Sequence, residues 1–196
     1  MKLQTALSLL LADLSVYKPD WNLSPPPLSL FLLFIAFLRC RDFRLNVFVR
    51  AQQAHIPVFS RLAHSLIFYL YGSTIDPGSF LGAPIRFVHA RNLVIGKHVR
   101  MSGQCILIFH NVTLGKLRPG ESSQPGSMPV VHGPVIFGSG STVLGGVSVS
   151  PHVVFGASSL CTLPHVQSYS TLVGYNLIHS GVFYDINFEC QLKPAF

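Results

Sequence analysis

Mostly apolar side chains recur at every sixth residue through most of the chain between residues 73 and 179. The positions form three runs: Ile75, Leu81 and Phe87; Ile95, Met101, Leu107 and Thr113; and Val131, Phe137, Val143, Val149, Phe155 and Cys161. A small residue often follows, as in Leu81-Gly82, which suits a tight turn. This period describes short parallel strands that coil around a triangular prism with three hexads to a turn. It predicts a mainly-β hexapeptide β-helix of a little over four turns, and favours that fold over an antiparallel sandwich.

The six-residue period breaks twice. Two extra residues lie between Phe87 and Ile95, within residues 88–92, and a longer excursion runs from Lys116 to Pro129. Insertions in a regular solenoid leave its surface as loops, and loops on rigid scaffolds commonly carry functional sites. Both breaks are therefore candidate functional regions.

Residues 1–72 carry helical signals instead. One face of a helix is indicated by the spacing of Phe59, Leu62, Ala63, Leu66, Ile67 and Leu70. We expect this helix to end at Gly72. Leu28 to Leu38 predicts another helix after a proline run. This apolar run is shorter than the roughly 20 residues of a membrane-spanning helix. We expect a helical extension over 1–72, a β-helix domain over 73–179 and a tail over 180–196.

Charge and cysteine content narrow the function classes. Fourteen Lys and Arg against seven Asp and Glu give a net charge of +7, without the basic and aromatic pattern that follows a nucleic-acid strand. No nucleic-acid partner is expected. The basic cluster Arg39, Arg41 and Arg44 is interpreted as a solvated helix end, with docking onto an acidic membrane surface as the alternative. The four cysteines form no C-x-x-C pair, so we predict no metal site and a reducing, cytoplasmic location.

Several motifs resemble the serine acetyltransferase branch of the hexapeptide-repeat acyltransferases, over about residues 60–178. Ile75-Asp76-Pro77-Gly78 is similar to that family's Ile-His-Pro-Gly, Val112-Thr113-Leu114-Gly115 to its Val-Thr-Leu-Gly, and Val143-Leu144-Gly145 to its Val/Ile-Leu-Gly. The resemblance implies a left-handed coil with a helical N-terminal segment. It also implies transfer of an acetyl group from acetyl-CoA to a hydroxyl, in clefts between the prisms of a trimer.

The resemblance places the general base at His89, in the first inserted loop. An imidazole can take the proton of a hydroxyl as that hydroxyl attacks a thioester. The family's partner carboxylate, fifteen residues upstream, is Thr74 in this chain. Asp76 lies two residues further on, where strand alternation points it to the same side. We therefore expect Asp76 to replace the missing carboxylate.

The acceptor-binding positions depart from the family pattern. Val88 stands where the family has an acidic residue before the histidine, and Ser127-Met128 replaces an Arg-His pair. Those groups hold serine in the family, so we expect a neutral hydroxyl on a sugar or polysaccharide precursor as acceptor. The predicted acceptor-binding residues are Thr74, His110 and Met128. A partly exposed strand histidine is the alternative interpretation of His110.

The resemblance also implies that backbone groups of the later hexads hold CoA. The matching positions are Gly138, Gly145, Gly146, Gly156 and Ala157. From its place in the long excursion, Lys116 is a further candidate for contact with the cofactor phosphates. Small residues that only serve the hexad turns are the alternative interpretation.

We therefore predict an acetyl-CoA-dependent O-acetyltransferase that forms a homotrimer or a dimer of trimers. The alternative is a catalytically silent β-helix subunit with an assembly or regulatory role, which the missing carboxylate at Thr74 favours.

Overall fold

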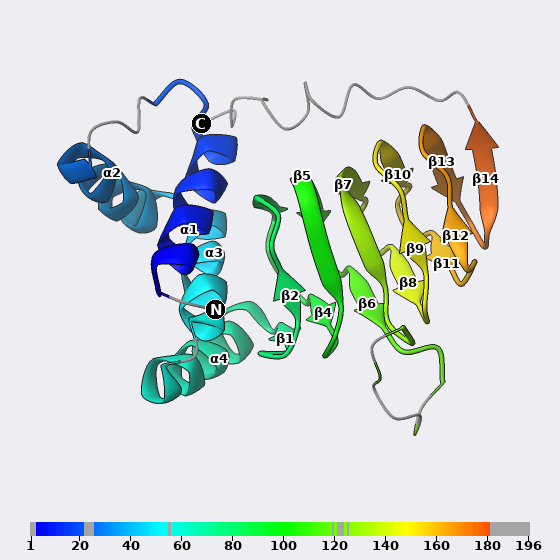
Figure 1. Ribbon diagram of the computed structural model, residues 1–196, viewed down its shortest axis with the longest axis horizontal. Coiled ribbons are helices and arrows are strands. Elements are labelled where there is room, and N and C mark those ends of the chain that lie inside the picture. The colour runs from blue at the N-terminus through cyan, green and yellow to red at the C-terminus, as the bar shows by residue number, and fades with distance from the viewer. Residues whose placement is uncertain are drawn as a thin grey trace.

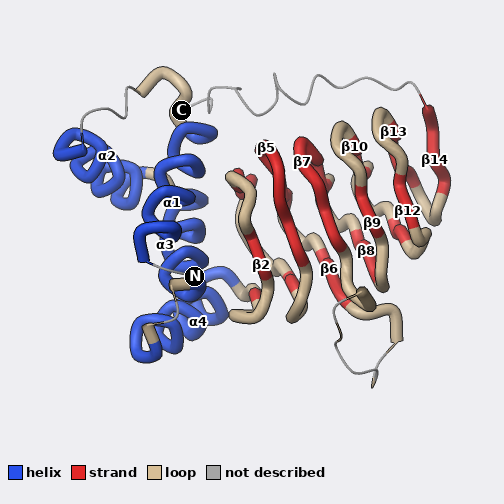
Figure 2. The backbone as a smooth tube through the Cα atoms, in the orientation of Figure 1, coloured by secondary structure: helices blue, strands red, loops and turns tan. Residues whose placement is uncertain are grey.

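The computed structural model describes residues 3–21, 26–54, 56–118, 120, 124 and 126–180. Four helices come first: α1 (Leu3–Tyr17), α2 (Pro26–Arg39), α3 (Arg41–Gln53) and α4 (Pro57–Tyr71). Short strands follow: β1 (Thr74–Ile75), β2 (Phe80–Leu81), β3 (Ile85–Val88), β4 (Val94–Ile95), β5 (Arg100–Phe109), β6 (Thr113–Gly115), β7 (Val130–Phe137), β8 (Thr142–Leu144), β9 (Ser148–Val149), β10 (Val153–Phe155), β11 (Leu160–Cys161), β12 (His165–Val166), β13 (Ser170–Val173) and β14 (Leu177–Ser180). The helices gather at one end of a stack of strands (Figures 1 and 2).

The change from helix to strand falls at Gly72. This residue caps α4 in the left-handed conformation, with φ of 59°, and its N–H donates to Phe68 O. Residues 181–196 of the predicted tail lie outside the described residues. None of the helices in the described part of the chain combines the length and the apolar character needed to cross a membrane.

The apolar face predicted for α4 is only partly buried. Ala63 and Ile67 pack inward, whereas Phe59, Leu62 and Leu70 are 61%, 55% and 53% exposed. The buried line of the helix, Ala63, Ile67 and Tyr71, packs chiefly against α3, and the exposed apolar side chains lie beside that line. Helical spacing alone does not separate these two parts of the face.

Three ladders of parallel strands form the walls of the prism. The first face stacks β1, β4, β6, β8 and β11. The second stacks β2, the start of β5, the start of β7, β9 and β12. The third stacks β3, the end of β5, the end of β7, β10 and β13. Each face thus has five strand layers, so the coil has five turns where the sequence predicted a little over four.

The side chains on the axis form three stacked rows of buried apolar residues. In order of the faces, these are Ile75, Ile95, Leu114, Val143 and Cys161; Leu81, Met101, Val131, Val149 and Val166; and Phe87, Ile108, Phe137, Phe155 and Leu172. Phe137 and Phe155 stack with ring centroids 4.9 Å apart and nearly parallel planes. The antiparallel strand β14 pairs with β13 at the far end of the prism (Figure 1).

Two predicted axis residues, Leu107 and Thr113, are wrong by one position. The pairing of β5 with β7 shifts between Gly103 and Ile106, where β5 contains one extra residue. The axis positions are therefore Ile108 and Leu114. Leu107 instead points outward and packs with Ile136 and Val154 on the third face.

Side chains of α1 and α3 satisfy the backbone of the first coil. A strand at the end of such a stack would otherwise leave its N–H and C=O groups without partners. Asp13 Oδ1 accepts from Ile85 N at 2.8 Å, Asn46 Nδ2 donates to Ile85 O at 2.8 Å, and Tyr17 Oη accepts from Phe87 N at 2.7 Å and donates to Phe87 O at 3.0 Å. Arg50 donates to Leu81 O and Ala83 O while forming a buried ion pair with Asp13 at 2.8 Å. The helices thereby cap the prism.

Candidate functional site

His89 follows β3 at the edge between the third and first faces. Its backbone has a φ of 54°, and its side chain is exposed. Asp42, in the first turn of α3, accepts hydrogen bonds from the backbone N–H groups of His89 and Ala90, both at 3.1 Å. Asp42 therefore fixes the loop and leaves the imidazole accessible. Sequence reasoning missed Asp42, because no local pattern relates two residues so far apart in the chain.

His110 lies on the same edge one turn further along the coil. Val88 pairs with Phe109, the residues directly before the two histidines, and the ring centroids of His89 and His110 are 6.3 Å apart. Ser139 Oγ hydrogen-bonds His110 Nδ1 at 3.4 Å. The structure thus brings together two predicted site residues and adds a hydroxyl that orients the second ring.

Asp76 and Thr74 lie on other parts of the first coil. Thr74 is exposed in β1 on the first face. Asp76 follows Ile75 at the edge between the first and second faces, and its Oδ1 accepts from Gly78 N at 2.7 Å. This edge is not the one that carries His89. An orienting role of Asp76 toward His89 stays a prediction.

The long excursion returns to the edge between the first and second faces. Met128 is 2% exposed and packs over Gly96, where a side chain on Gly96 would collide with it. Within one copy, Met128 is therefore a core residue that presents no surface to an acceptor. Lys116, Gly145 and Gly146 belong to this same edge: Gly145 N donates to Gly115 O at 2.9 Å, and the backbone of Gly126 lies against Gly146.

An apolar groove of about 480 Å³ runs along the outside of the third face. Three of the predicted cofactor positions line it, namely Gly138, Gly156 and Ala157, together with Phe109 and His179. The coil itself also requires the two glycines, since a Cβ at Gly138 would lie 2.7 Å from Phe155 O and one at Gly156 3.0 Å from Leu172 O. Of the six predicted cofactor residues, these three lie in the groove and the other three on the excursion edge.

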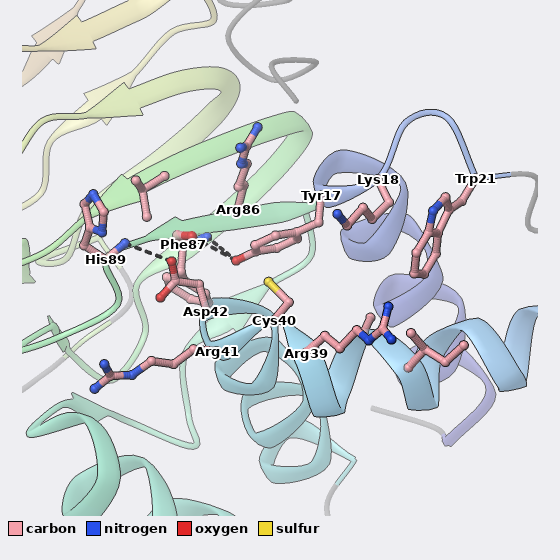
Figure 3. Close-up of a pocket in the computed structure, with 13 residues that line it drawn as sticks. Tyr17, Lys18, Trp21, Arg39, Cys40, Arg41, Asp42, Arg86, Phe87 and His89 are labelled. Carbon is pink, nitrogen blue, oxygen red and sulfur yellow. Dashed lines mark hydrogen bonds between the residues drawn. The ribbon is translucent and has the colours of Figure 1, made fainter. Parts of the chain in front are cut away.

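A second cavity, of about 590 Å³, lies where the helices meet β3 (Figure 3). Four basic residues from separate parts of the chain line it: Lys18, Arg39, Arg41 and Arg86. Lys18 Nζ lies 5.7 Å from the centroid of the Trp21 ring, and Arg86 Cζ lies 5.9 Å from that of Tyr17. His89 lines one end of this cavity and Trp21 lies at the other (Figure 3). Sequence reasoning did not identify Lys18 and Arg86, and it interpreted Arg39 and Arg41 as a solvated helix end.

The basic pocket and the apolar groove occupy the same face of the prism. Arg86 of the pocket pairs with Leu107 of the groove, and Leu107 pairs with Ile136. His89 lines the pocket, while His110 follows Phe109, which lines the groove. The two histidines thus lie on the edge of the face that carries both the pocket and the groove.

Tyr17 forms a buried wall of the basic pocket. Burial raises the pKa of its phenol well above the ordinary value of 10.0, and the nearby Cys40 and Asp42 raise the pKa further. The neutral hydroxyl donates toward Phe87 O at 3.0 Å and Asn46 Oδ1 at 3.1 Å. Tyr17 is therefore a structural residue of the pocket.

In the described ranges, His, Cys, Asp and Glu form no group of three or more that could hold a metal ion.

These features define the class of the molecule: a mainly-β, left-handed parallel β-helix of hexapeptide repeats with a helical N-terminal segment, as predicted. Solved serine acetyltransferases share this fold. The Neisseria gonorrhoeae enzyme has a TM-score of 0.71 at 18% identity, covering 98% of this chain and 73% of that structure. A serine acetyltransferase in complex with cysteine has a TM-score of 0.68 at 22% identity, covering 90% of this chain and 71% of that one.

Sequence comparison gives the same relatives. Serine acetyltransferase of Staphylococcus xylosus is 33% identical over 118 residues, which is 60% of this chain and 52% of the relative. The mitochondrial serine acetyltransferase 3 of Arabidopsis thaliana is 30% identical over 145 residues, 74% of this chain and 35% of the relative. The resemblance to serine acetyltransferases is thus confirmed, although the chain spans only about half or a third of the length of these relatives. No protein-family profile matches the chain.

Proposed function

We propose that this protein is an acetyl-CoA-dependent O-acetyltransferase with His89 as general base. The observation that carries the proposal is the exposed imidazole of His89 at the end of the basic pocket, on the prism face that also carries the apolar groove. Asp42 holds the backbone N–H of His89 and so fixes the loop. The similarity to curated serine acetyltransferases supports the reaction class. One solved structure of the same fold is a serine acetyltransferase in complex with CoA, which supports CoA as the carrier of the acyl group.

The reaction needs only one group that takes and returns a proton. His89 removes the proton of the acceptor hydroxyl while the oxygen attacks the thioester carbonyl, so that a C–O bond forms. Collapse of the tetrahedral intermediate breaks the C–S bond, and the imidazolium returns the proton to the sulfur of CoA. His110, oriented by Ser139, lies within reach of the same centre and would hold the acceptor or the developing oxyanion.

The donor is placed in the apolar groove. Gly138, Gly156 and Ala157 would contact its pantetheine arm, because they leave the backbone accessible there. Lys116, Gly145 and Gly146 lie on a different edge of the prism. Their predicted contact with the cofactor therefore requires a second copy of the chain.

The separation of the two edges supports a homotrimer or a dimer of trimers. Within one copy the first inserted loop, with His89, and the long excursion lie on different edges, so a neighbouring prism is needed to bring them together. The exposed side chains of Phe59, Leu62 and Leu70 on α4 suit a further contact between copies. A peripheral membrane contact of the N-terminal segment, and the cytoplasmic location, stay predictions.

The acceptor is proposed to be a hydroxyl of a sugar or polysaccharide precursor rather than serine. Val88 lines the pocket beside His89 in place of the family's acidic residue. The one carboxylate lining the pocket among the described residues, Asp42, is already bonded to two backbone N–H groups. The ammonium group of serine would therefore find no free carboxylate there, and an unpaired charge is costly.

The proposed function is tested by measuring the release of CoA thiol with the purified chain, acetyl-CoA and a panel of hydroxyl acceptors that includes serine. Thiol release that depends on an acceptor and is lost in His89→Ala supports the proposal. Efficient acetylation of free serine would overturn the acceptor assignment. A chain that binds acetyl-CoA and transfers to no acceptor of the panel would favour the silent β-helix subunit.

A further inference from the structure

We infer that the basic pocket binds a phosphoryl group carried by the acceptor. The pocket is lined by Lys18, Arg39, Arg41 and Arg86, and His89 lies at its end. The inference rests on the proposed function, since His89 is the group that would receive the acceptor's hydroxyl. It changes the sequence-based expectation of an uncharged acceptor into that of a sugar phosphate or a related phosphorylated precursor.

The first argument is the balance of charge in the pocket. Among the described residues that line the pocket, Lys18, Arg39 and Arg41 stand beside a single carboxylate, Asp42, and both oxygens of Asp42 are bonded to backbone N–H groups of the His89 loop. Among the described residues, the ion pair that forms is that of Arg50 with Asp13. No described carboxylate forms an ion pair with Lys18, Arg39 or Arg41. Gathered like charges repel one another, and a bound anion relieves that repulsion.

The second argument is the position of the four basic residues in the fold. Lys18 directly follows α1, Arg39 lies in the last turn of α2, Arg41 in the first turn of α3 and Arg86 in strand β3. A cation in the last turn of a helix is favourable by itself, which accounts for Arg39 alone. Arg41 stands at a helix N-terminus, where the helix dipole disfavours positive charge. The convergence of separate parts of the chain therefore points to a ligand rather than to solvation of a helix end.

The third argument is the shape and chemistry of the walls. Guanidinium groups match the oxygens of a phosphoryl group with paired donors, and a dianion suits several cations better than a single carboxylate does. Trp21, Ile35 and Ala36 supply apolar walls beside the cations. A volume of about 590 Å³ lies within the range of small-molecule sites. A hexose phosphate would place its phosphoryl group among the arginines and a ring hydroxyl toward His89.

The test compares three ligands by calorimetry with the purified full chain, before any acetyl-CoA is added: glucose 1-phosphate, glucose and glucuronic acid. We expect glucose 1-phosphate to bind at least about tenfold more tightly than either of the others, because charge-assisted hydrogen bonds are the strong ones. Equal binding of glucose and glucose 1-phosphate would overturn the inference. Preference for glucuronic acid would overturn the phosphoryl assignment.

Variants locate the bound group. Arg39→Gln combined with Arg41→Gln should weaken the binding of glucose 1-phosphate by about tenfold or more and leave the KM for acetyl-CoA unchanged. Arg61→Gln, an exposed arginine of α4, is the matched control and should change neither value. Lys18→Gln provides a second, independent variant, and circular dichroism confirms that each variant is folded. A higher KM for acetyl-CoA with unchanged binding of glucose 1-phosphate would show that the pocket holds the donor's phosphates and would overturn the inference.

The two proposals fail in different ways. Binding of glucose 1-phosphate that depends on Arg39 and Arg41, without acetyl transfer to any acceptor, would uphold the phosphoryl site and contradict the proposed function. Acetyl transfer to neutral sugars at the same rate as to their phosphates would uphold the function and contradict the phosphoryl site.

Discussion

The backbone N–H of His89 donates to the Asp42 carboxylate, which fixes the position of His89, and the exposed side chain of His89 lines the basic pocket. If it is the general base, His89→Ala should lower turnover by about 10² to 10⁴ while the KM for acetyl-CoA and the melting temperature stay unchanged. His165→Ala, at an exposed histidine of β12, is the control. Steady-state kinetics on an accepted substrate gives the result, and wild-type turnover in His89→Ala would contradict the assignment.

A substitution of Asp76 tests whether this carboxylate orients His89 or only holds its own turn. A carboxylate that orients a catalytic histidine contributes about 10⁴ in turnover where this has been measured in triads. Because Asp76 bonds Gly78 N on another edge, and an amide oxygen can keep that bond, we expect Asp76→Asn to lower turnover by less than about tenfold. The comparison of kcat for the two proteins decides. A loss as large as that of His89→Ala would assign Asp76 the orienting role.

Tyr17 couples stability to alkaline pH. Its pKa is raised in the folded state, so the folded state holds the phenolic proton more tightly than the unfolded chain does. The stabilisation is complete below the unfolded value of 10.0 and is lost as the pH rises through the higher folded value. Tyr17→Phe should lower the free energy of unfolding at pH 7 by about 1–3 kcal/mol, because the Phe87 N–H loses its partner.

Urea titrations at pH 7 and at pH 10.5 measure both effects. The decrease in stability between the two pH values should be smaller in Tyr17→Phe than in the parent protein. An equal decrease in both proteins would show that other groups, such as the buried Tyr71 and Cys161 whose pKa values are also raised by burial, cause it.

At the scale of elements, the contact between helices and prism depends on polar side chains that reach the backbone of the first coil. The ion pair of Asp13 with Arg50 is the buried centre of this contact, with Arg50 2% exposed and Asp13 0% exposed. Asp13→Ala leaves the Arg50 guanidinium and Ile85 N without their carboxylate partner. We expect it to lower the free energy of unfolding by about 3–5 kcal/mol. Ser15→Ala, exposed on the same helix, is the control, and denaturant unfolding is the measurement. A loss below about 1 kcal/mol would show that the helices contribute little to the stability of the prism.

At the scale of the whole molecule, the predicted contact of Lys116 with the donor requires a neighbouring prism, so we expect a trimer or a dimer of trimers. Light scattering at micromolar concentration should give a mass of three or six times 21.5 kDa. A second experiment mixes two impaired variants, His89→Ala and Lys116→Glu, in one assembly. Hybrid trimers should regain activity, because some clefts then combine an intact His89 with an intact Lys116 from the neighbour. A monomeric protein, or hybrids without recovery, would contradict a site shared between copies.

The hexad period by itself determined the fold. A side chain that points to the axis of a prism every sixth residue is a local constraint, and it remains visible in one sequence wherever the neighbouring positions are polar or small. The prediction failed at Leu107 and Thr113 for a related reason: Ile106, Leu107 and Ile108 are all apolar, so the period could not reveal the extra residue in β5. Only the pairing of β5 with β7 decided which of them faces the axis.

For the proposed site, the sequence indicated single residues but not the pocket around them. His89 was predicted from the family resemblance and its place in the first break of the period, and His110 from its place one hexad before the second break. The pocket beside His89 was not predicted, because Lys18, Arg39 and Arg86 are far apart in the chain and meet only when α1 and the junction of α2 with α3 pack against β3. The sequence also did not reveal the edge of the prism at which each insertion lies, since this depends on which strand is assigned to which of the three faces. Long-range packing decided both, and no local pattern in a single sequence encodes it.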